Sequence, residues 1–263
     1  PTPYAPRALA AALHRRESLG FDLCLYVVGG EQRLHFKQLK AVLERMGIDW
    51  AERIVHVDFG LIRFQEGRMS TRHGKVVFLD EVLDLSVARV REIMAEKNPG
   101  LADRERVAEA VGVGAVVFND LKAGRVKEVL YDPAEITRFD GETGPYVQYA
   151  GARLCGILRN AALQGVEPDP GADLSLLGDA RETLHCLGAW GETLERAVRE
   201  NEPSVVTGHT IRLARAIHGF LQDHRVLGVE PALSRARLLL VAAARRQIEQ
   251  GLGLIGLAAP EAM

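Results

Sequence analysis

The stretch Leu-Cys-Leu-Tyr-Val-Val-Gly-Gly, residues 23–30, decides the fold class of the first part of this chain. Its apolar residues run without interruption into two glycines, a pattern that indicates a short strand buried on both faces. Residues 33–46 follow with apolar side chains at helical spacing, and Gly47 stands where helices commonly end. Residues 53–57 are again strand-like. Strand, helix and strand at this spacing predict an α/β unit with a parallel strand pair.

Outward from this unit, the apolar periodicity predicts further short strands and helices. They are a helix at 7–18, strands at 59–63 and 76–78, helices at 80–97 and 103–121, and mixed structure at 124–140. From Thr143 to the end the pattern is almost wholly helical, and we expect four or five helices. The breaks between them fall at 166–171, at 202–203 and at 228–231, where proline, glycine and polar residues gather. The fold class is therefore α/β followed by all-α.

Composition sets limits on location and partners. The chain has 263 residues, of which 47% are hydrophobic and 26% are charged, so it can bury a normal core. No apolar run approaches the roughly 20 residues of a membrane helix, and nothing at the start has the pattern of a signal peptide. We expect a cytosolic protein without membrane contact. The net charge of −2 excludes a broadly basic nucleic-acid binder, so RNA contacts would have to be local patches.

The three cysteines, Cys24, Cys155 and Cys186, are scattered and show no metal-ligand spacing. We expect reduced thiols and no zinc site.

The segment Gly-Arg-Met-Ser-Thr-Arg-His-Gly, residues 67–74, carries the clearest chemistry. It lies between two predicted strands and is therefore a loop with a glycine at each end. Its two guanidinium groups, four residues apart, could close on a polyphosphate and stabilise charge that builds up during transfer. A solvated basic loop is the alternative interpretation of this segment taken alone.

This loop resembles the KMSKS element of class I aminoacyl-tRNA synthetases, in the variant found in arginyl-tRNA synthetases. The resemblance extends over most of the chain through runs that recur in that family. These runs are 26–29 with Gln32, 35–40, 96–99, 111–115, the highly specific Gly-Glu-Thr-Gly-Pro-Tyr-Val-Gln-Tyr-Ala at 141–150, and 254–256 with Pro260 and Met263. We identify a similarity to the C-terminal half of the arginyl enzymes.

The resemblance implies three segments. Residues 1–78 would be the C-terminal part of a Rossmann-like catalytic core with its KMSKS-type loop. Residues 79–140 would form a connecting helical region that contacts the tRNA stem. Residues 141–263 would form a helical-bundle anticodon-binding domain of the DALR type.

In the loop, the resemblance gives Arg68, Ser70 and Arg72 the catalytic positions. Their implied role is to stabilise the transition state as ATP loses pyrophosphate and arginyl-adenylate forms. Arg68, Arg72 and Met69 would also contact ATP, together with His35, which matches a family position near the nucleotide. For His35, helix capping or partial burial is an equally ordinary explanation. Magnesium would arrive bound to ATP, because the chain shows no dedicated carboxylate cage and we expect no protein metal site.

Arginine binding is implied for Tyr4 and Gln32, which match family residues that contact the amino acid. The family has an Asp four residues after this Tyr, where the chain has Ala8. A guanidinium without its carboxylate partner is costly in a pocket. Because Ala8 supplies no carboxylate at this position, it argues against arginine recognition.

In the helical part, Tyr146 and Tyr149 stand one turn apart after Gly144-Pro145, where a helix accepts proline in its first turn. Core packing is one explanation of the two rings, and a platform for unpaired anticodon bases is the other. The resemblance favours the platform for at least one ring. Arg153, one turn further, could reach a phosphate, and Met263 matches a family terminus beside the anticodon loop.

The HIGH signature, whose histidines contact ATP in class I synthetases, is absent from this sequence. The chain is then either a piece that needs a complementing N-terminal half or a truncated paralogue that binds tRNA without aminoacylation. Both alternatives predict that the isolated chain makes no arginyl-adenylate. The implied partners are arginine, ATP and tRNA(Arg). An apolar edge on the incomplete core predicts contact with a complementing half or self-association. A helical scaffold that binds protein would require the run at 141–150 to be coincidence.

Overall fold

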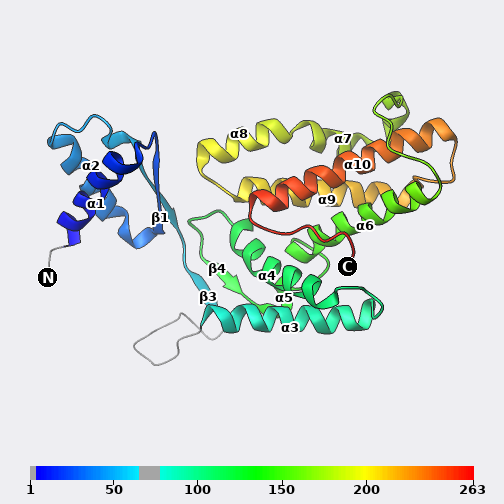
Figure 1. Ribbon diagram of the computed structural model, residues 1–263, viewed down its shortest axis with the longest axis horizontal. Coiled ribbons are helices and arrows are strands. Elements are labelled where there is room, and N and C mark those ends of the chain that lie inside the picture. The colour runs from blue at the N-terminus through cyan, green and yellow to red at the C-terminus, as the bar shows by residue number, and fades with distance from the viewer. Residues whose placement is uncertain (1–3, 65–77) are drawn as a thin grey trace. The chain divides into compact units, whose positions relative to one another are not determined.

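The computed structural model describes residues 4–64 and 78–263, which group into two compact units (Figure 1). The N-terminal unit comprises the chain as far as Leu61 together with Arg125–Glu128. The helical unit comprises Ile62–Gly124 and Val129–Met263. The predicted KMSKS-type loop and most of the predicted strand at 76–78 lie outside the described residues.

The N-terminal unit contains the predicted strand–helix–strand. Its elements are α1 (Tyr4–Leu19), β1 (Cys24–Gly29), the 3-10 turn η1 (Gly30–Gln32), α2 (Arg33–Arg45), η2 (Ala51–Arg53) and β2 (Ile54–Phe59). β1 and β2 pair in parallel, with Cys24 opposite Ile54 and Gly29 opposite Phe59. Gly47 follows α2 with a φ of 76°, a left-handed conformation that glycine adopts without steric cost. The predicted parallel pair is confirmed.

One face of this small sheet packs on the helices and the other does not. Phe36, Leu39 and Leu43 of α2 are buried with Ile54 in the core of the unit. On β1, however, the side chains of Leu25 and Val27 are 46% and 66% exposed. The prediction of a strand buried on both faces is therefore wrong here. Side chains alternate along a strand, and the described sheet has two strands with helices that cover one side only.

The helical unit begins with two long helices and a short parallel strand pair. Its elements are β3 (Ile62–Phe64), α3 (Leu79–Lys97), α4 (Arg104–Lys122), β4 (Val129–Tyr131), α5 (Pro133–Ile136), α6 (Gly144–Leu163), η4 (Leu174–Ala180), α7 (Arg181–Gly188), α8 (Trp190–Glu200), α9 (Ser204–Asp223) and α10 (Pro231–Leu254). β3 pairs with β4 and does not extend the β1–β2 sheet. The strand predicted at 59–63 is thus the end of β2 followed by a separate β3.

The helices after residue 143 match the predicted pattern, with α6 to α10 among the described residues. The Thr143 hydroxyl accepts a hydrogen bond from the Tyr146 amide at 3.2 Å and caps α6, with Pro145 in the first turn. α10 packs against α6 and α9 around fully buried side chains such as Leu154, Leu213 and Leu238. This core holds in place α6, which carries the predicted tRNA contacts Tyr146, Tyr149 and Arg153.

None of the described helices is long and apolar enough to cross a membrane. Cys24, Cys155 and Cys186 are half-buried free thiols. The predicted functional boundaries near residues 78 and 140 stay a prediction, because packing alone defines the two compact units.

Candidate functional site

Three of the predicted substrate contacts meet in the N-terminal unit. The Tyr4 hydroxyl donates a hydrogen bond to Gln32 Oε1 at 2.8 Å. The Tyr4 ring lies against the His35 imidazole, with ring centres 4.6 Å apart. The first turn of α1, the turn η1 after β1, and the start of α2 therefore bring Tyr4, Gln32 and His35 together. They present a phenol, an amide and an imidazole at the carboxyl end of β1, where open α/β folds bind ligands.

The cavity beside these residues is mainly apolar. It has a volume of about 260 Å³ and is lined by Ala5, Pro6, Leu9, His35, Gln38, Leu39 and Val42. Ala8 is half-buried and packs on the core of the unit, so no carboxylate enters from that position. The cavity suits an aliphatic chain or a ring, and a guanidinium would find no charged partner along its lining.

The carboxyl end of β2 carries a cluster that the sequence did not predict. Asp58 accepts hydrogen bonds from Arg33 Nε and from Arg125 Nη1. Burial tends to raise the pKa of Asp58, but the hydrogen bonds from Arg125 and Arg33 outweigh it and hold the pKa below its usual value. Asp58 is therefore a paired carboxylate, committed to the two arginines. Arg125 is distant from Asp58 in the sequence, and no pattern in the sequence predicted that the two residues would be in contact.

Arg68, Met69, Ser70 and Arg72, the residues predicted for the catalytic loop, lie outside the described residues.

A second cavity, in the helical unit, joins Tyr149 to the C-terminal Met263. It has a volume of about 360 Å³ and is lined by Ile93, Met94, Lys97, Asn98, Phe139, Tyr149 and Met263. Tyr149, 40% exposed, meets the Phe139 ring edge-on at a centre distance of 6.4 Å. Asn98 Nδ2 donates to the Met263 carbonyl at 3.0 Å and ties the C-terminus to the end of α3. Two of the predicted tRNA contacts thus share one cavity.

The chemistry of this cavity fits a flat ring with polar edges. Aromatic faces and thioethers offer dispersion contacts to a ring, and base–aromatic stacking tolerates every base. The Lys97 ammonium and the Asn98 amide lie in the same lining, where they can meet polar atoms at a ring edge. Unstacked bases in RNA loops are bound by this combination of groups.

Tyr146 and Arg153 belong to a different cluster, around His218 of α9. Arg153 Nη1 lies 3.3 Å from His218 Nδ1, so Nδ1 is the acceptor and carries no proton. Burial first, and then the charge of Arg153, lower the pKa of His218. The Tyr146 ring lies 6.3 Å from the imidazole, and burial raises the pKa of its phenol. The two tyrosines of α6 therefore contact different neighbours.

Sequence reasoning missed several residues of these two clusters. Lys97 and Asn98 belong to the run at 96–99 that recurs in the family, but the resemblance implied no role for them. That run was the sequence feature that could have pointed to these two residues. Phe139 is an isolated aromatic residue in a segment of mixed pattern, and nothing in the sequence marked it. His218 could be found only from its neighbours in space.

Two family models match the chain. One, described as "tRNA synthetases class I (R), catalytic domain", matches residues 2–132. The other, described as "DALR anticodon binding domain", matches residues 147–263. Together they place the chain among the class I aminoacyl-tRNA synthetases, with part of a catalytic domain followed by an anticodon-binding domain.

Curated relatives narrow the class. Arginine–tRNA ligases of Clostridioides difficile and Ligilactobacillus salivarius are 42% and 47% identical to the whole chain, which covers 46% of each relative. The structure of Thermus thermophilus arginyl-tRNA synthetase matches with a TM-score of 0.84 at 31% identity, over 92% of this chain and 41% of that one. That of the Plasmodium falciparum enzyme, at 16% identity and a TM-score of 0.80, shows the shared fold. The chain belongs to the arginyl-tRNA synthetase family and spans about half the length of these curated relatives.

Proposed function

We propose that this chain works as the C-terminal half of an arginine–tRNA ligase, with ATP, arginine and tRNA(Arg) as substrates and the cytosol as its location. Two observations support this. Both family models match in the expected order, and Tyr149 meets the distant Met263 in one base-sized cavity.

The reaction has two steps. An arginine carboxylate oxygen attacks the α-phosphorus of ATP, the bond to the bridging oxygen of the β-phosphate breaks, and pyrophosphate leaves. A hydroxyl of the terminal ribose of tRNA then attacks the carbonyl carbon of the adenylate, and AMP leaves. Arg68 and Arg72, with Ser70, would stabilise the charge on the phosphates in the first step. Magnesium would come with ATP. Among the described residues, no group of three or more His, Cys, Asp or Glu side chains is placed to hold a metal ion.

In the N-terminal unit, Tyr4 and Gln32 would contact the arginine substrate and His35 the nucleotide. The Tyr4–Gln32 hydrogen bond supports this assignment, because it orients both polar groups at the same strand end. Ala8 favours a second candidate function, that of a paralogue that binds tRNA without aminoacylation. A separately produced N-terminal half distinguishes the two candidates. Restored aminoacylation supports the ligase, and an assembled complex without it supports the paralogue.

The open face of β1 supports a complementing partner. Leu25 and Val27 expose apolar side chains on a strand that pairs along one edge only among the described residues, as expected for a parallel sheet that continues into another segment. Val27→Lys should weaken association with the N-terminal half in analytical ultracentrifugation, because it places a charge on the covered face. Leu19→Lys changes an apolar residue of α1 that is somewhat more exposed than Val27, and it should have no effect. Self-association of the chain alone, lost in Val27→Lys, would instead identify a second copy as the partner.

In the helical unit, an anticodon base would enter the cavity of Tyr149 and Met263, and Arg153 would lie near a phosphate. Tyr149→Ala should weaken binding to an arginine tRNA transcript roughly tenfold, since a stacking contact is worth about 1–3 kcal/mol per base. Leu163→Ala, on the same helix and almost fully exposed, is the matched control and should bind as the unchanged chain does.

The deciding measurement compares wild-type and anticodon-altered transcripts. Equal binding of the two transcripts, or equal binding by Tyr149→Ala and the unchanged chain, would contradict the anticodon assignment. ATP–pyrophosphate exchange by the isolated chain should be absent. Measurable exchange would show that activation of arginine does not require the HIGH signature.

A further inference from the structure

A third cavity lies between α8 and α9, outside every contact used above. It has a volume of about 340 Å³ and is lined by Ala189, Glu192, Thr193, Arg196, Glu202, Ser204, Val205 and Arg212. It shares no residue with the cavity of Tyr149 and Met263. Within the helical unit, Figure 1 shows α8 and α3 at opposite edges, so the two cavities belong to different sides.

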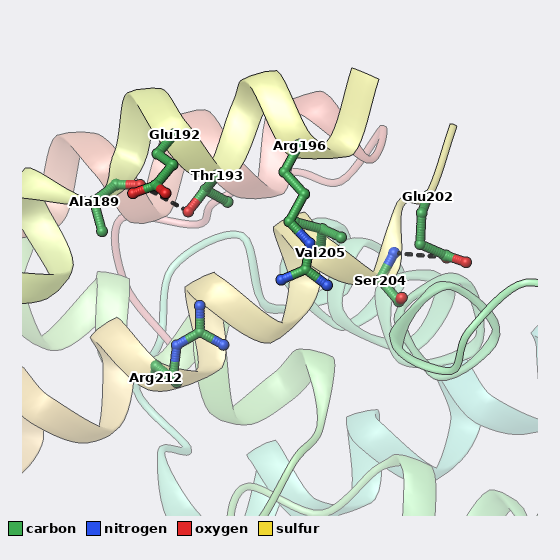
Figure 2. Close-up of a pocket in the computed structure, with 8 residues that line it drawn as sticks. All are labelled: Ala189, Glu192, Thr193, Arg196, Glu202, Ser204, Val205 and Arg212. Carbon is green, nitrogen blue, oxygen red and sulfur yellow. Dashed lines mark hydrogen bonds between the residues drawn. The ribbon is translucent and has the colours of Figure 1, made fainter. Parts of the chain in front are cut away.

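Two guanidinium groups enter this cavity from facing helices. Figure 2 shows Arg196 descending from α8 and Arg212 rising from α9 into the space between them. Arg196 uses its Nε to bond Glu200 at 3.2 Å, and its terminal nitrogens have no partner among the described residues. Arg212 makes no hydrogen bond or ion pair with any described residue. Two guanidinium groups that line the same cavity repel each other. An anion between them is attracted to both, and these attractions outweigh the repulsion.

We propose that this α8–α9 cavity binds a phosphate group through Arg196 and Arg212. Guanidinium is the side-chain group best matched to phosphate, because its N–H groups form a planar fork that fits two oxygens. The Ser204 hydroxyl on the rim adds a further donor. The phosphate belongs either to a free phosphate ester or to the backbone of an RNA. This inference stands apart from the proposed function, since it uses neither the catalytic residues nor the anticodon cavity.

The carboxylates of the cavity sharpen the proposal. Glu202 accepts a hydrogen bond from the Ser204 amide at 3.2 Å, which directs it toward the start of α9. Glu192 forms no ion pair with any described residue and faces the same space. It opposes an incoming phosphate, so its neutralisation should tighten binding. The Arg212 and Glu192 variants are therefore expected to shift affinity in opposite directions.

His209 provides a built-in reporter. Its ring is buried, with Nδ1 3.1 Å from the hydroxyl of Thr193, a residue of the cavity lining. The charge of Arg212 contributes to the lowered pKa of His209, after burial. Phosphate bound to Arg212 offsets that charge, and the pKa of His209 should rise as the cavity fills.

The test is a titration of the 263-residue chain with inorganic phosphate at constant ionic strength, followed by the NMR signals of His209 and of the Ser204 and Val205 amides. We expect saturable shifts in the unchanged chain. Arg212→Gln should weaken binding about tenfold, as expected for the loss of a charged hydrogen bond, and Glu192→Gln should strengthen it. Arg199→Gln, an exposed arginine on α8 outside the cavity, should leave affinity unchanged.

A single-stranded RNA oligonucleotide then distinguishes the two sources. Competition with phosphate for the same shifts assigns the cavity to an RNA backbone, and a lack of competition assigns it to a small phosphate ester. Circular dichroism checks that each variant is folded. If Arg212→Gln does not fold, Arg212→Lys, which keeps the charge, is measured in its place. The proposal is wrong if the shifts do not saturate, or if Arg212→Gln and Arg199→Gln bind phosphate equally.

Discussion

The N-terminal unit and the helical unit differ in what covers their apolar side chains. In the helical unit, α10 lies among α6, α9 and η4, and Leu154, Leu213 and Leu238 have no exposed surface. In the N-terminal unit, helices cover one face of a two-stranded sheet, and Leu25 and Val27 stay open. A helical bundle closes on itself, whereas a parallel sheet needs further strands and a second layer of helices. The described part of the first unit therefore leaves an apolar sheet face uncovered, which is the face on which the proposed complementing segment would pack.

The largest expected effect comes from the helical core. Leu154→Ala leaves a cavity in a fully buried site and should lower the free energy of unfolding by about 2–5 kcal/mol. Leu25→Ala removes a half-exposed side chain and should change it by well under 1 kcal/mol. Urea denaturation followed by circular dichroism measures both. Equal losses would mean that the open face of β1 is covered in solution.

The next effect concerns His209, which is buried between α8 and α10. The Thr193 hydroxyl donates to the Ala189 carbonyl, so His209 Nδ1 must donate to Thr193, and Nε2 accepts from Gln247 Nε2 at 2.9 Å. This pattern requires a neutral imidazole. In agreement, burial, followed by the charge of Arg212, lowers the pKa of His209 to about 4 from 6.5.

The lowered pKa of His209 predicts a pH dependence of stability. Between pH 6.5 and about 4 the unfolded chain binds a proton that folded His209 refuses. The contribution of His209 to the free energy of unfolding is therefore complete above pH 6.5, and it falls by about 3 kcal/mol as the pH drops to 4. The His209→Gln variant has no imidazole to titrate at this position. The difference in free energy of unfolding between this variant and the unchanged chain should therefore shrink as the pH is lowered. A pH-independent difference would show that His209 is protonated in the fold.

The smallest effect compares two glycines inside helices of the helical unit. A Cβ on Gly112 of α4 would stand 2.5 Å from Val87 Cα of α3, while a Cβ on Gly156 of α6 would meet nothing within 4 Å. Gly112→Ala should push α3 from α4 and cost about 1–3 kcal/mol. Gly156→Ala should stabilise by about 0.5–1 kcal/mol through helix propensity. Thermal unfolding gives both signs, and a stabilising Gly112→Ala would show that α3 and α4 pack less tightly.

Much of the fold could be predicted from local patterns. The parallel β1–β2 pair, the end of α3 at Lys97, and the start of α6 at Gly144-Pro145 all follow from residues close together in the chain. The candidate site was predicted only in part. Tyr4 and Gln32 share a hydrogen bond in the structure, but their implied contact with arginine stays a prediction, as do the roles of the loop residues.

Local sequence patterns were enough to predict the strand–helix–strand unit, the helical character after residue 143 and the family, because periodicity and motifs are local properties. Tertiary packing was needed to show that β1 has an open face, that Asp58 binds Arg33 and Arg125, and that Arg196 and Arg212 line one cavity. It was also needed to show that Tyr149 contacts Phe139 and lines a cavity with Met263, while Tyr146 lies beside His218. These facts depend on which surfaces meet, and residues distant in sequence come together only when the helices pack.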